Sequence, residues 1–248
     1  MRNDSYATFT IRLIVAGYDC SETEQIELDN DVEQKSWLGR LVNGHEASVY
    51  GEVLPEGIQT LLDYIDNDMP LSPADVFVDL GSGTGKIVIQ VALSTNFKKV
   101  VGIELSETRH QHAIKAVAEA RKISRMKEES DTKAAVLQCV PFAKRTTDDV
   151  ASGRVQLIHG DIMKPTYNDA THLYAASTTW PDILLHTVAQ LAVTEIKHVK
   201  TFSTLRPLPS STLAEFPSIS LWKAVDVAVS WQDTAPIHIY KFGNEKKG

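Results

Sequence analysis

A glycine-rich turn after a short apolar run carries the strongest chemical signal in this sequence. The run 76–80 is apolar apart from Asp79, and Gly81, Gly83 and Gly85 follow it at alternate positions. An apolar run that ends in a glycine turn is typical of a buried parallel strand. Glycine lets the backbone bend sharply and approach a ligand, and the amides of a following helix can bind the ligand's polar groups. The pattern predicts a ligand-binding loop; the alternative is a tight turn that only packs a helix on a strand.

The spacing of the glycines distinguishes three kinds of nucleotide ligand. A dinucleotide loop requires G-x-G-x-x-G, and Lys86 occupies the last position of that pattern. A phosphate-binding P-loop requires Gly-Lys-Ser/Thr, but Ile87 follows Lys86 and Leu80 stands where the first glycine belongs. The remaining pattern, D-x-G-x-G-x-G from Asp79 to Gly85, resembles the first motif of class I S-adenosylmethionine (SAM) methyltransferases.

Two more polar residues follow predicted strands at the spacing that such a site needs. The run 99–104 ends in Glu104, 25 residues after the aspartate of the first run, and a carboxylate there can accept both ribose hydroxyls of a nucleoside. The alternative for Glu104 is an ordinary exposed glutamate. A third run, 155–162, ends with Asp161 and Ile162. We expect this aspartate to contact the adenine amino group and the isoleucine to lie beside the ring.

Strands and helices must alternate along the chain to bring these residues together. The sequence predicts an α/β fold: a doubly wound, seven-stranded Rossmann-like SAM methyltransferase sheet with a small N-terminal extension. We expect residues 1–45 to form an N-terminal arm, residues 46–248 to form the methyltransferase domain, and residues 129–153 to form a surface insertion. The expected strands are 76–80, 99–104, 155–162, 171–176, 199–205, 222–230 and 237–242, the last antiparallel to the sixth, with helices at 55–65, 86–93, 106–126 and 181–196.

In two of the expected helices, the helical spacing places a set of residues on one face. In the helix at 55–65, four apolar residues share one side. In the helix at 106–126, Ser106 is expected to cap the N-terminus. The predicted faces are Ile58, Leu61, Leu62 and Ile65 in the first helix, and Ile114, Val117, Ala118 and Arg121 in the second.

Composition excludes several other classes of protein. The chain has 248 residues, of which 43% are hydrophobic, enough for one large domain. Cys20 and Cys139 are too few for a disulfide or zinc framework, and no apolar run is long enough to span a membrane. We therefore expect an intracellular protein. The net charge of −7 does not favour nonspecific nucleic-acid binding, although residues 121–145 are locally basic and could contact a substrate or nucleic acid.

Several motifs together resemble the disruptor of telomeric silencing one (Dot-one) family of histone lysine methyltransferases, over roughly residues 45–242. The glycine loop is shared by many methyltransferases, whereas the Tyr-Gly-Glu and Val-Ser-Trp pieces are specific to this family. The matching pieces are Val49-Tyr50-Gly51-Glu52, Phe77 to Gly83, Ile87 to Ala92, Leu205-Arg206-Pro207-Leu208, and Val229-Ser230-Trp231 followed by Pro236 and Tyr240.

The resemblance implies SAM as the cofactor, no metal, and a role for each matching residue. The cofactor-binding residues would be Tyr50, Glu52, Asp79, Gly81, Gly83, Gly85, Gln90, Glu104, Asp161 and Ile162. Trp231 and Tyr240 would form the walls of a lysine channel; the alternative for these two residues is an aromatic pair in the core. The implied substrate is a histone, in free or nucleosomal form, and the implied location is the nucleus, or the cytoplasm if the substrate is not a histone.

The sequence departs from the family after the fourth expected strand. Family members carry an asparagine step beside the reacting groups, where this chain has Ala175 and Ala176. Ser177 or a backbone carbonyl could replace the asparagine. Two alternatives therefore stay open: a SAM-dependent methyltransferase of a small molecule or non-histone protein, and a SAM-binding protein without transfer activity.

Overall fold

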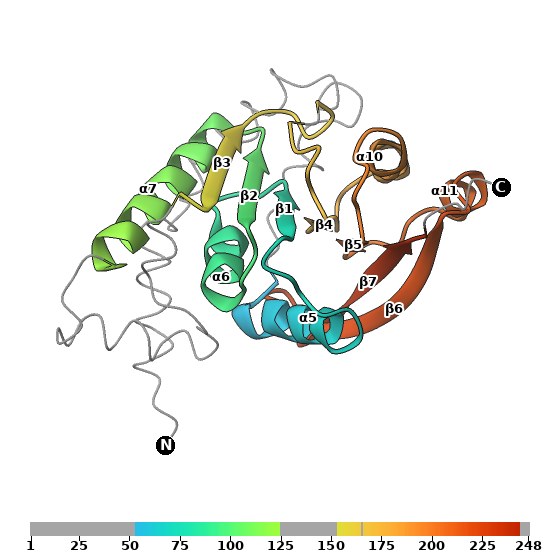
Figure 1. The fold of residues 1–248 in the computed structure, drawn as a ribbon, viewed down its shortest axis with the longest axis horizontal. Helices are drawn as coiled ribbons and strands as arrows, with labels where there is room; N and C mark the ends of the chain where they lie inside the picture. The colour runs from blue at the N-terminus through green and yellow to red at the C-terminus, as the bar shows by residue number, and fades with distance from the viewer. Residues whose placement is uncertain (1–52, 125–152, 165, 244–248) are drawn as a thin grey trace.

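A seven-stranded sheet forms the centre of the molecule. The structure, a computed structural model, describes residues 53–124, 153–164 and 166–243. The strand order is β3-β2-β1-β4-β5-β7-β6 (Figure 1). Seven strands were expected, and seven are present in the described residues. They are β1 Val76–Leu80, β2 Lys99–Glu104, β3 Val155–His159, β4 His172–Ala175, β5 Thr201–Thr204, β6 Ile219–Ala228 and β7 Thr234–Phe242.

Strand direction divides the sheet into two parts. The strands from β3 to β5 pair in parallel, whereas β7 is antiparallel to both β5 and β6. The predicted antiparallel pairing of the last two strands is therefore confirmed. The helices are α5 Pro55–Asp68, α6 Lys86–Ser94, α7 Glu107–Ser124, α10 Asp182–Thr194 and α11 Ser210–Glu215; the sequence analysis did not predict the short α11.

Helices cover both faces of the sheet, as the doubly wound prediction requires. Along β1, Val76, Val78 and Leu80 belong to one apolar core and Phe77 belongs to the other. The first core includes apolar residues of α10, and the second includes apolar residues of α5 and α6. The two layers lie on opposite sides of the sheet (Figure 1). An apolar strand with both faces buried therefore positions the loop that follows it.

The strand order reverses between β1 and β4. From β1 the chain passes through α6 to β2 on one side, whereas β4 and β5 lie on the other side of β1. In open α/β sheets, ligands bind beyond the carboxyl ends of the strands at such a reversal. The turns after β1 and β4 therefore border the expected ligand site.

The buried face of α7 differs from the predicted face. Ile114 is 42% exposed and Ala118 is exposed, whereas Ala113 and Val117 are buried against the sheet. Of the three described residues that the sequence places on one side of this helix, Val117 alone is buried. The mean hydropathy of α7 is low, and several alanines fit either side, so contacts with β2 and β3 determine which side is buried.

Helix α5 packs directly on β6 through its first turn. Pro55 begins the helix, and the predicted apolar face formed by Ile58, Leu61, Leu62 and Ile65 is buried. Just before the helix, the amide of Leu54 donates a hydrogen bond of 2.9 Å to a β6 carbonyl. The chain that enters α5 is thus fixed beside the carboxyl end of β6.

Candidate functional site

The glycine loop after β1 forms a compact turn. Gly81, Gly83 and Gly85 all have positive φ, a conformation that glycine adopts without strain. The amides of Gly81 and Ser82 both donate to the carbonyl of Ile103 at 2.9 Å. A Cβ on Gly85 would lie 3.1 Å from the Cβ of an alanine in α7, so this glycine also permits close packing of α7. The turn is held by the backbone of the neighbouring strand.

The start of α6 presents backbone amides toward the turn. Gly85 is its N-cap, and no side chain caps the helix. The first amides of a helix have no partner within the helix, and they carry the positive end of its dipole. The turn and the start of α6 lie together at the place where the sequence predicts a ligand-binding loop.

Glu104 at the end of β2 connects this cradle to the next helix. Its Oε2 accepts a hydrogen bond of 2.7 Å from the Gly83 amide, and its Oε1 accepts one of 2.8 Å from the Ser106 amide. Glu104 is 5% exposed. Each carboxylate oxygen can accept two hydrogen bonds, so both keep acceptor capacity for a ligand hydroxyl. The Arg109 amide donates to the Ser106 hydroxyl at 3.3 Å, in agreement with the predicted cap.

Asp79 lies beneath the loop and is almost completely buried. Burial raises the pKa of its carboxyl to about 8, and the nearby charge of Glu104 contributes in the same direction. A bound cation would favour the charged form of the carboxyl and lower this pKa again.

The end of β3 supplies the third polar tip, the segment that follows the strand and contains Asp161 and Ile162. The Gly160 amide donates to the Glu104 carbonyl at 2.9 Å, which brings the ends of β2 and β3 together. The next residues, Asp161 and Ile162, are half-buried. The carboxylate of Asp161 accepts a bond of 2.9 Å from the amide two residues further on, and Tyr167 donates from its hydroxyl to the Ile162 carbonyl at 2.7 Å. The backbone of this tip is thus fixed beside Glu104.

Two histidines border this tip. The rings of His110 and His159 stack with centroids 5.4 Å apart. His159 also pairs with Glu107 at 2.8 Å, and burial followed by the charge of His159 lowers the pKa of His110. The pair packs the start of α7 on the end of β3.

Gln90 lies in the middle of α6, away from the turn. Its Nε2 donates to the Pro55 carbonyl at 2.6 Å and so ties α6 to the start of α5. The predicted cofactor residues Tyr50 and Glu52 lie outside the described residues. The proposed arm 1–45 and the insertion 129–153, apart from its last residue, are also outside them, as is most of the basic region 121–145.

Trp180, in the segment after β4, lies beside the glycine loop, and it is not among the site residues predicted from the sequence. A Cβ placed on Gly81 would lie 3.7 Å from the Trp180 ring, and Trp180 is 8% exposed. The Trp-Pro pair after an apolar run was the signal that could have indicated it. Arg206 binds the Trp180 carbonyl and pairs with Asp182 at 2.6 Å, so it fixes this segment beside the loop.

Ser177 is fully buried in the same segment. Its Oγ accepts a hydrogen bond of 3.1 Å from the Arg206 amide. The two positions that lack the family asparagine behave differently, because Ala175 is fully buried whereas Ala176 is half-buried. The hydroxyl of Ser177 therefore joins the turns that follow β4 and β5.

Trp231 and Tyr240 lie on different parts of the β6–β7 hairpin. Trp231 follows β6 and is 42% exposed, whereas Tyr240 is 1% exposed and its hydroxyl accepts a bond of 2.8 Å from the Leu208 amide. Tyr240 lies six positions after Thr234, the first residue of β7. Six positions correspond to roughly 20 Å of strand. The structure does not bring the two rings together as paired walls of one channel.

The described residues contain neither a candidate metal site nor a membrane-spanning helix. In the described ranges, no group of three or more His, Cys, Asp or Glu side chains could hold a metal ion. Among the helices that the structure describes, none has the length and apolar character needed to cross a membrane.

The fold and the site define the class of the protein. Five parallel strands with a reversal beside β1, an antiparallel β7 inserted before β6, and a glycine loop after β1 form the class I SAM-dependent methyltransferase fold.

Comparisons with known proteins connect this fold with one family. A profile of the family described as "Histone methylation protein DOT1" matches residues 40–133, which include the glycine loop and Glu104. A curated relative from Caenorhabditis elegans, "Histone-lysine N-methyltransferase, H3 lysine-79 specific", is 44% identical over 61 residues, which are 25% of this chain and 6% of the relative. A protein of the same description from Drosophila melanogaster is 40% identical over 65 residues, 26% of this chain and 3% of the relative.

The resemblance to the Dot-one family is therefore confirmed over this segment, while the match covers only a small part of the length of each relative. Among solved structures, TrmN from Thermus thermophilus is 15% identical with a TM-score of 0.49, covering 76% of this chain and 48% of that chain. An RNA methyltransferase from Salinibacter ruber in complex with S-adenosyl-L-homocysteine is 15% identical with a TM-score of 0.44, covering 75% of this chain and 93% of that chain.

Proposed function

We propose that this chain is a SAM-dependent methyltransferase that acts on a lysine side chain of a nucleosomal core histone. The observation that carries the proposal is the link between Gly83 and Glu104, which joins the glycine loop to the carboxylate expected at the ribose. Support for the substrate comes from the similarity of residues 40–133 to histone methylation proteins. A nuclear location follows from that substrate.

The described residues fit the proposed cofactor. The glycine turn provides positive-φ positions beside the start of α6, and Glu104 keeps acceptor capacity for ribose hydroxyls. Asp161 and Ile162 would lie on the adenine side. When bound, SAM supplies an electrophilic methyl group on a positively charged sulfur.

Methyl transfer requires a neutral lysine amine. Free lysine has a pKa of about 10.4, so the site must lower it by removing water from the amine. SAM held by the glycine turn and Glu104 would supply the methyl group, and the residues around the lysine amine would exclude water from it. Trp231 would pack its aromatic face against the aliphatic part of the lysine chain and help to exclude water from the amine. Ser177 and Tyr240 would hold the surrounding turns through their bonds to Arg206 and Leu208.

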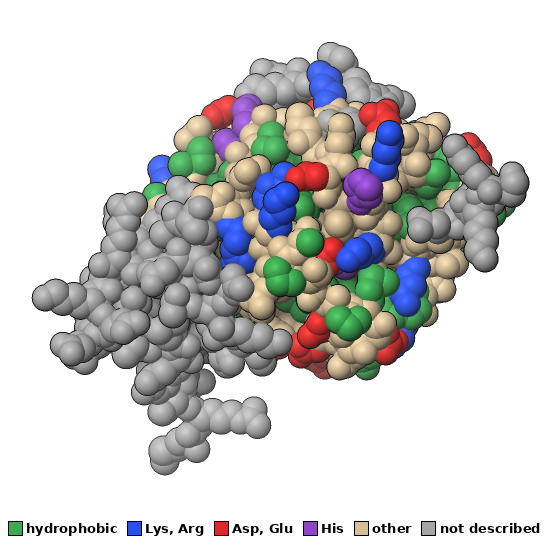
Figure 2. Space-filling view, in the orientation of Figure 1, with side chains coloured by type: hydrophobic (Ala, Val, Ile, Leu, Met, Phe, Trp, Pro, Cys, Tyr) green, Lys and Arg blue, Asp and Glu red, His purple; other side chains and the backbone are tan. Residues whose placement is uncertain are grey.

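Contact with a nucleosome would rest on the basic region 121–145. On the face shown in Figure 2, the described Lys and Arg side chains are interspersed with acidic and uncharged ones. The chain as a whole has a net charge of −7. If the basic region contacts DNA phosphates, nucleosome affinity should fall steeply with added salt.

The proposal is tested by incubating the protein with radiolabelled SAM and, in parallel, nucleosomes, free histones and a cell lysate. We expect label on a core histone in nucleosomes. The control is Gly83→Arg, which places a large side chain at a positive-φ position in the loop and should abolish SAM binding. Label only on a metabolite or non-histone protein would reject the histone substrate. SAM binding without transfer to any substrate would reject the enzymatic proposal.

A further inference from the structure

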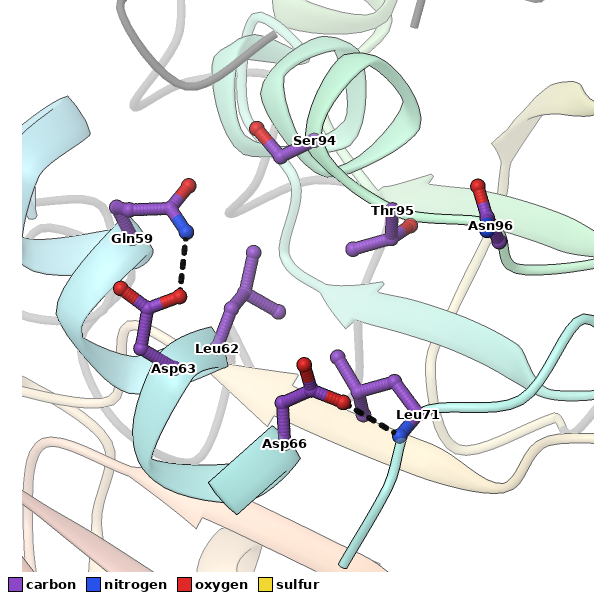
Figure 3. A pocket seen from close by; sticks show the side chains of 8 residues that line it. All are labelled: Gln59, Leu62, Asp63, Asp66, Leu71, Ser94, Thr95 and Asn96. Carbon is purple, nitrogen blue, oxygen red and sulfur yellow. Dashed lines mark hydrogen bonds between the residues drawn. The ribbon is translucent and has the colours of Figure 1, made fainter. Parts of the chain in front are cut away.

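A small cleft lies between α5 and the carboxyl end of α6 (Figure 3). Its volume is about 160 Å³. It is lined by Gln59, Leu62, Asp63, Asp66, Leu71, Ser94, Thr95 and Asn96. The glycine loop is at the opposite end of α6, a helix of nine residues and therefore about 13 Å long. The cleft is thus separate from the proposed methyl-transfer site.

Two buried polar atoms in the cleft have no hydrogen-bond partner within the part of the chain that the structure describes. They are Oε1 of Gln59 and Oγ of Ser94, and these residues are 5% and 4% exposed. The Nε2 of Gln59 donates to Asp63 at 2.7 Å, which fixes the orientation of the amide. In Figure 3 the Gln59 oxygen and the Ser94 hydroxyl come from α5 and α6, on facing sides of the cleft. Because unpaired buried polar groups are costly, the arrangement favours an occupant that forms hydrogen bonds.

The charge of the cleft favours a donor that is also a cation. Asp63 and Asp66 lie one turn apart on α5, and neither α5 nor α6 has a basic residue in its last turn. Arg154 binds carbonyls of residues 92, 95 and 97 at the end of α6 but does not line the cleft. The nearby Lys223 is paired with Asp68 at 2.7 Å. Among the described residues that line the cleft, none is a lysine or an arginine.

We propose that this cleft binds an alkylammonium group. A primary ammonium has three N–H donors, which match the Gln59 oxygen, the Ser94 hydroxyl and the Asp63 carboxylate. Its carbon chain would lie against Leu62 and Leu71. The cleft is smaller than the roughly 300–1,000 Å³ of sites for drug-sized ligands. It therefore suits a short free amine or the end of one lysine side chain.

The test uses the full chain labelled with ¹⁵N and follows amide chemical shifts at constant ionic strength. The probes are n-butylammonium, the neutral n-butanol, and a lysine blocked at both its backbone amino and carboxyl groups. We expect saturable shifts around residues 59–66 and 94–96 with the amines and none with n-butanol. A stronger response to butylammonium indicates a free amine, and a stronger response to blocked lysine indicates a protein side chain.

Variants separate specific binding from surface attraction. Asp63→Asn and Ser94→Ala should each weaken butylammonium binding about tenfold, as expected for loss of a hydrogen bond to a charged group. Asp226→Asn, which removes an exposed carboxylate on β6, should leave it unchanged. Absence of saturable shifts with either amine would overturn the proposal. Equal binding by Asp63→Asn, Ser94→Ala and the unaltered protein would also overturn it.

Discussion

Glu104 shows how one side chain can organise the site at the scale of single residues. Its two oxygens accept hydrogen bonds from the Gly83 amide and the Ser106 amide, so a single carboxylate joins the glycine turn to the start of α7. The carboxylate is buried and held by these bonds before any ligand binds. Preorganisation of this kind lowers the cost of binding, because little side-chain freedom remains to be lost.

Asp79 should give the free energy of unfolding a distinctive pH dependence. Its pKa of about 8 in the folded protein compares with about 3.9 in an unfolded chain. The folded state therefore binds the extra proton between these values, and stability falls as pH rises from about 4 to 8. In urea unfolding, Asp79→Asn should remove a slope of up to about 1.4 kcal/mol per pH unit.

The matched control for this measurement is Asp226→Asn, because Asp226 is exposed. It should keep the pH dependence of the unaltered protein between pH 5 and 7. Parallel stability curves for Asp79→Asn and the unaltered protein would show that the carboxyl of Asp79 is not protonated in the fold.

Trp231 is expected to act on the lysine substrate and not on the cofactor. Its ring is 42% exposed beyond the carboxyl end of β6. Trp231→Ala should lower kcat/KM for lysine methylation by about tenfold or more through loss of aromatic contact, while the Kd for SAM stays unchanged. Leu221→Ala is the control, since Leu221 is 50% exposed near the other end of β6. If Trp231→Ala weakened SAM binding as much as it lowered kcat/KM, the proposed contact of Trp231 with the lysine substrate would be contradicted.

At the scale of elements, the close packing of α5 on β6 positions the chain that precedes the helix. Gly57 faces the strand so closely that an added Cβ would lie 2.5 Å from the Ala228 carbonyl oxygen. Ahead of the helix, Val53 forms a bridge with Val229, and Leu54 donates to the Ala228 carbonyl. The helix therefore holds the chain that precedes it beside the end of β6 and the start of the hairpin turn.

Gly57→Ala should reverse the usual effect of this substitution. In an exposed helix the change stabilises by about 1 kcal/mol, but here the clash with backbone should cost roughly 1–3 kcal/mol. Urea unfolding measures the difference in the free energy of unfolding. Asn67→Ala, at an exposed position of α5, should change stability by less than about 0.5 kcal/mol. A stabilised Gly57→Ala variant would show that α5 can move away from β6.

At the scale of the whole molecule, the residues at the carboxyl ends of the parallel strands differ in their chemistry from the residues at the amino ends. The proposed ligand site occupies the carboxyl ends of the parallel strands. At the amino ends of the strands, Asp75 accepts a hydrogen bond of 2.6 Å from Lys200 and lies 3.5 Å from His172. The ring of His172 in turn forms a hydrogen bond of 2.8 Å with the hydroxyl of Thr201. This cluster joins the starts of β1, β4 and β5. It is buried except for Lys200, so it serves stability.

Asp75 should determine part of the acid stability of the fold. Burial acts to raise the pKa of its carboxyl, but the nearby His172 and the hydrogen bonds from Lys200 and the Ser72 amide outweigh it and hold the pKa below its usual range. Its contribution is therefore present above about pH 4, the pKa of an unfolded aspartate, and is lost as pH falls below that value.

Removing this carboxylate measures the contribution directly. Asp75→Ala should cost about 2–3 kcal/mol at pH 7, the lower part of the range for a buried pair because Lys200 is partly exposed. The difference from the unaltered protein should shrink in urea unfolding below pH 4. Asp169→Ala, which breaks the more exposed pair with Lys99, should cost less than about 1 kcal/mol. Equal costs for the two variants would contradict a special role for Asp75.

The sequence determined the strands, the glycine loop and the order of the polar tips. Short apolar runs that end in Gly81, Glu104 and Asp161 carry this information locally, because buried parallel strands must be apolar and their ligands lie at their carboxyl ends. The bounds of β1 and β2 agree with the prediction for the same reason. The residues matched by the family profile, 40–133, include the first two of these run ends, Gly81 and Glu104.

Tertiary structure decided which side chains meet. The sequence could not show that Trp180 lies against Gly81, that Tyr240 binds the turn after β5, or that α7 buries Ala113 instead of Ile114. These outcomes depend on contacts between segments far apart in the chain. Where a short apolar pattern fits either face of a helix or strand, packing against neighbouring elements selects one face, and the sequence of the segment alone does not contain that choice.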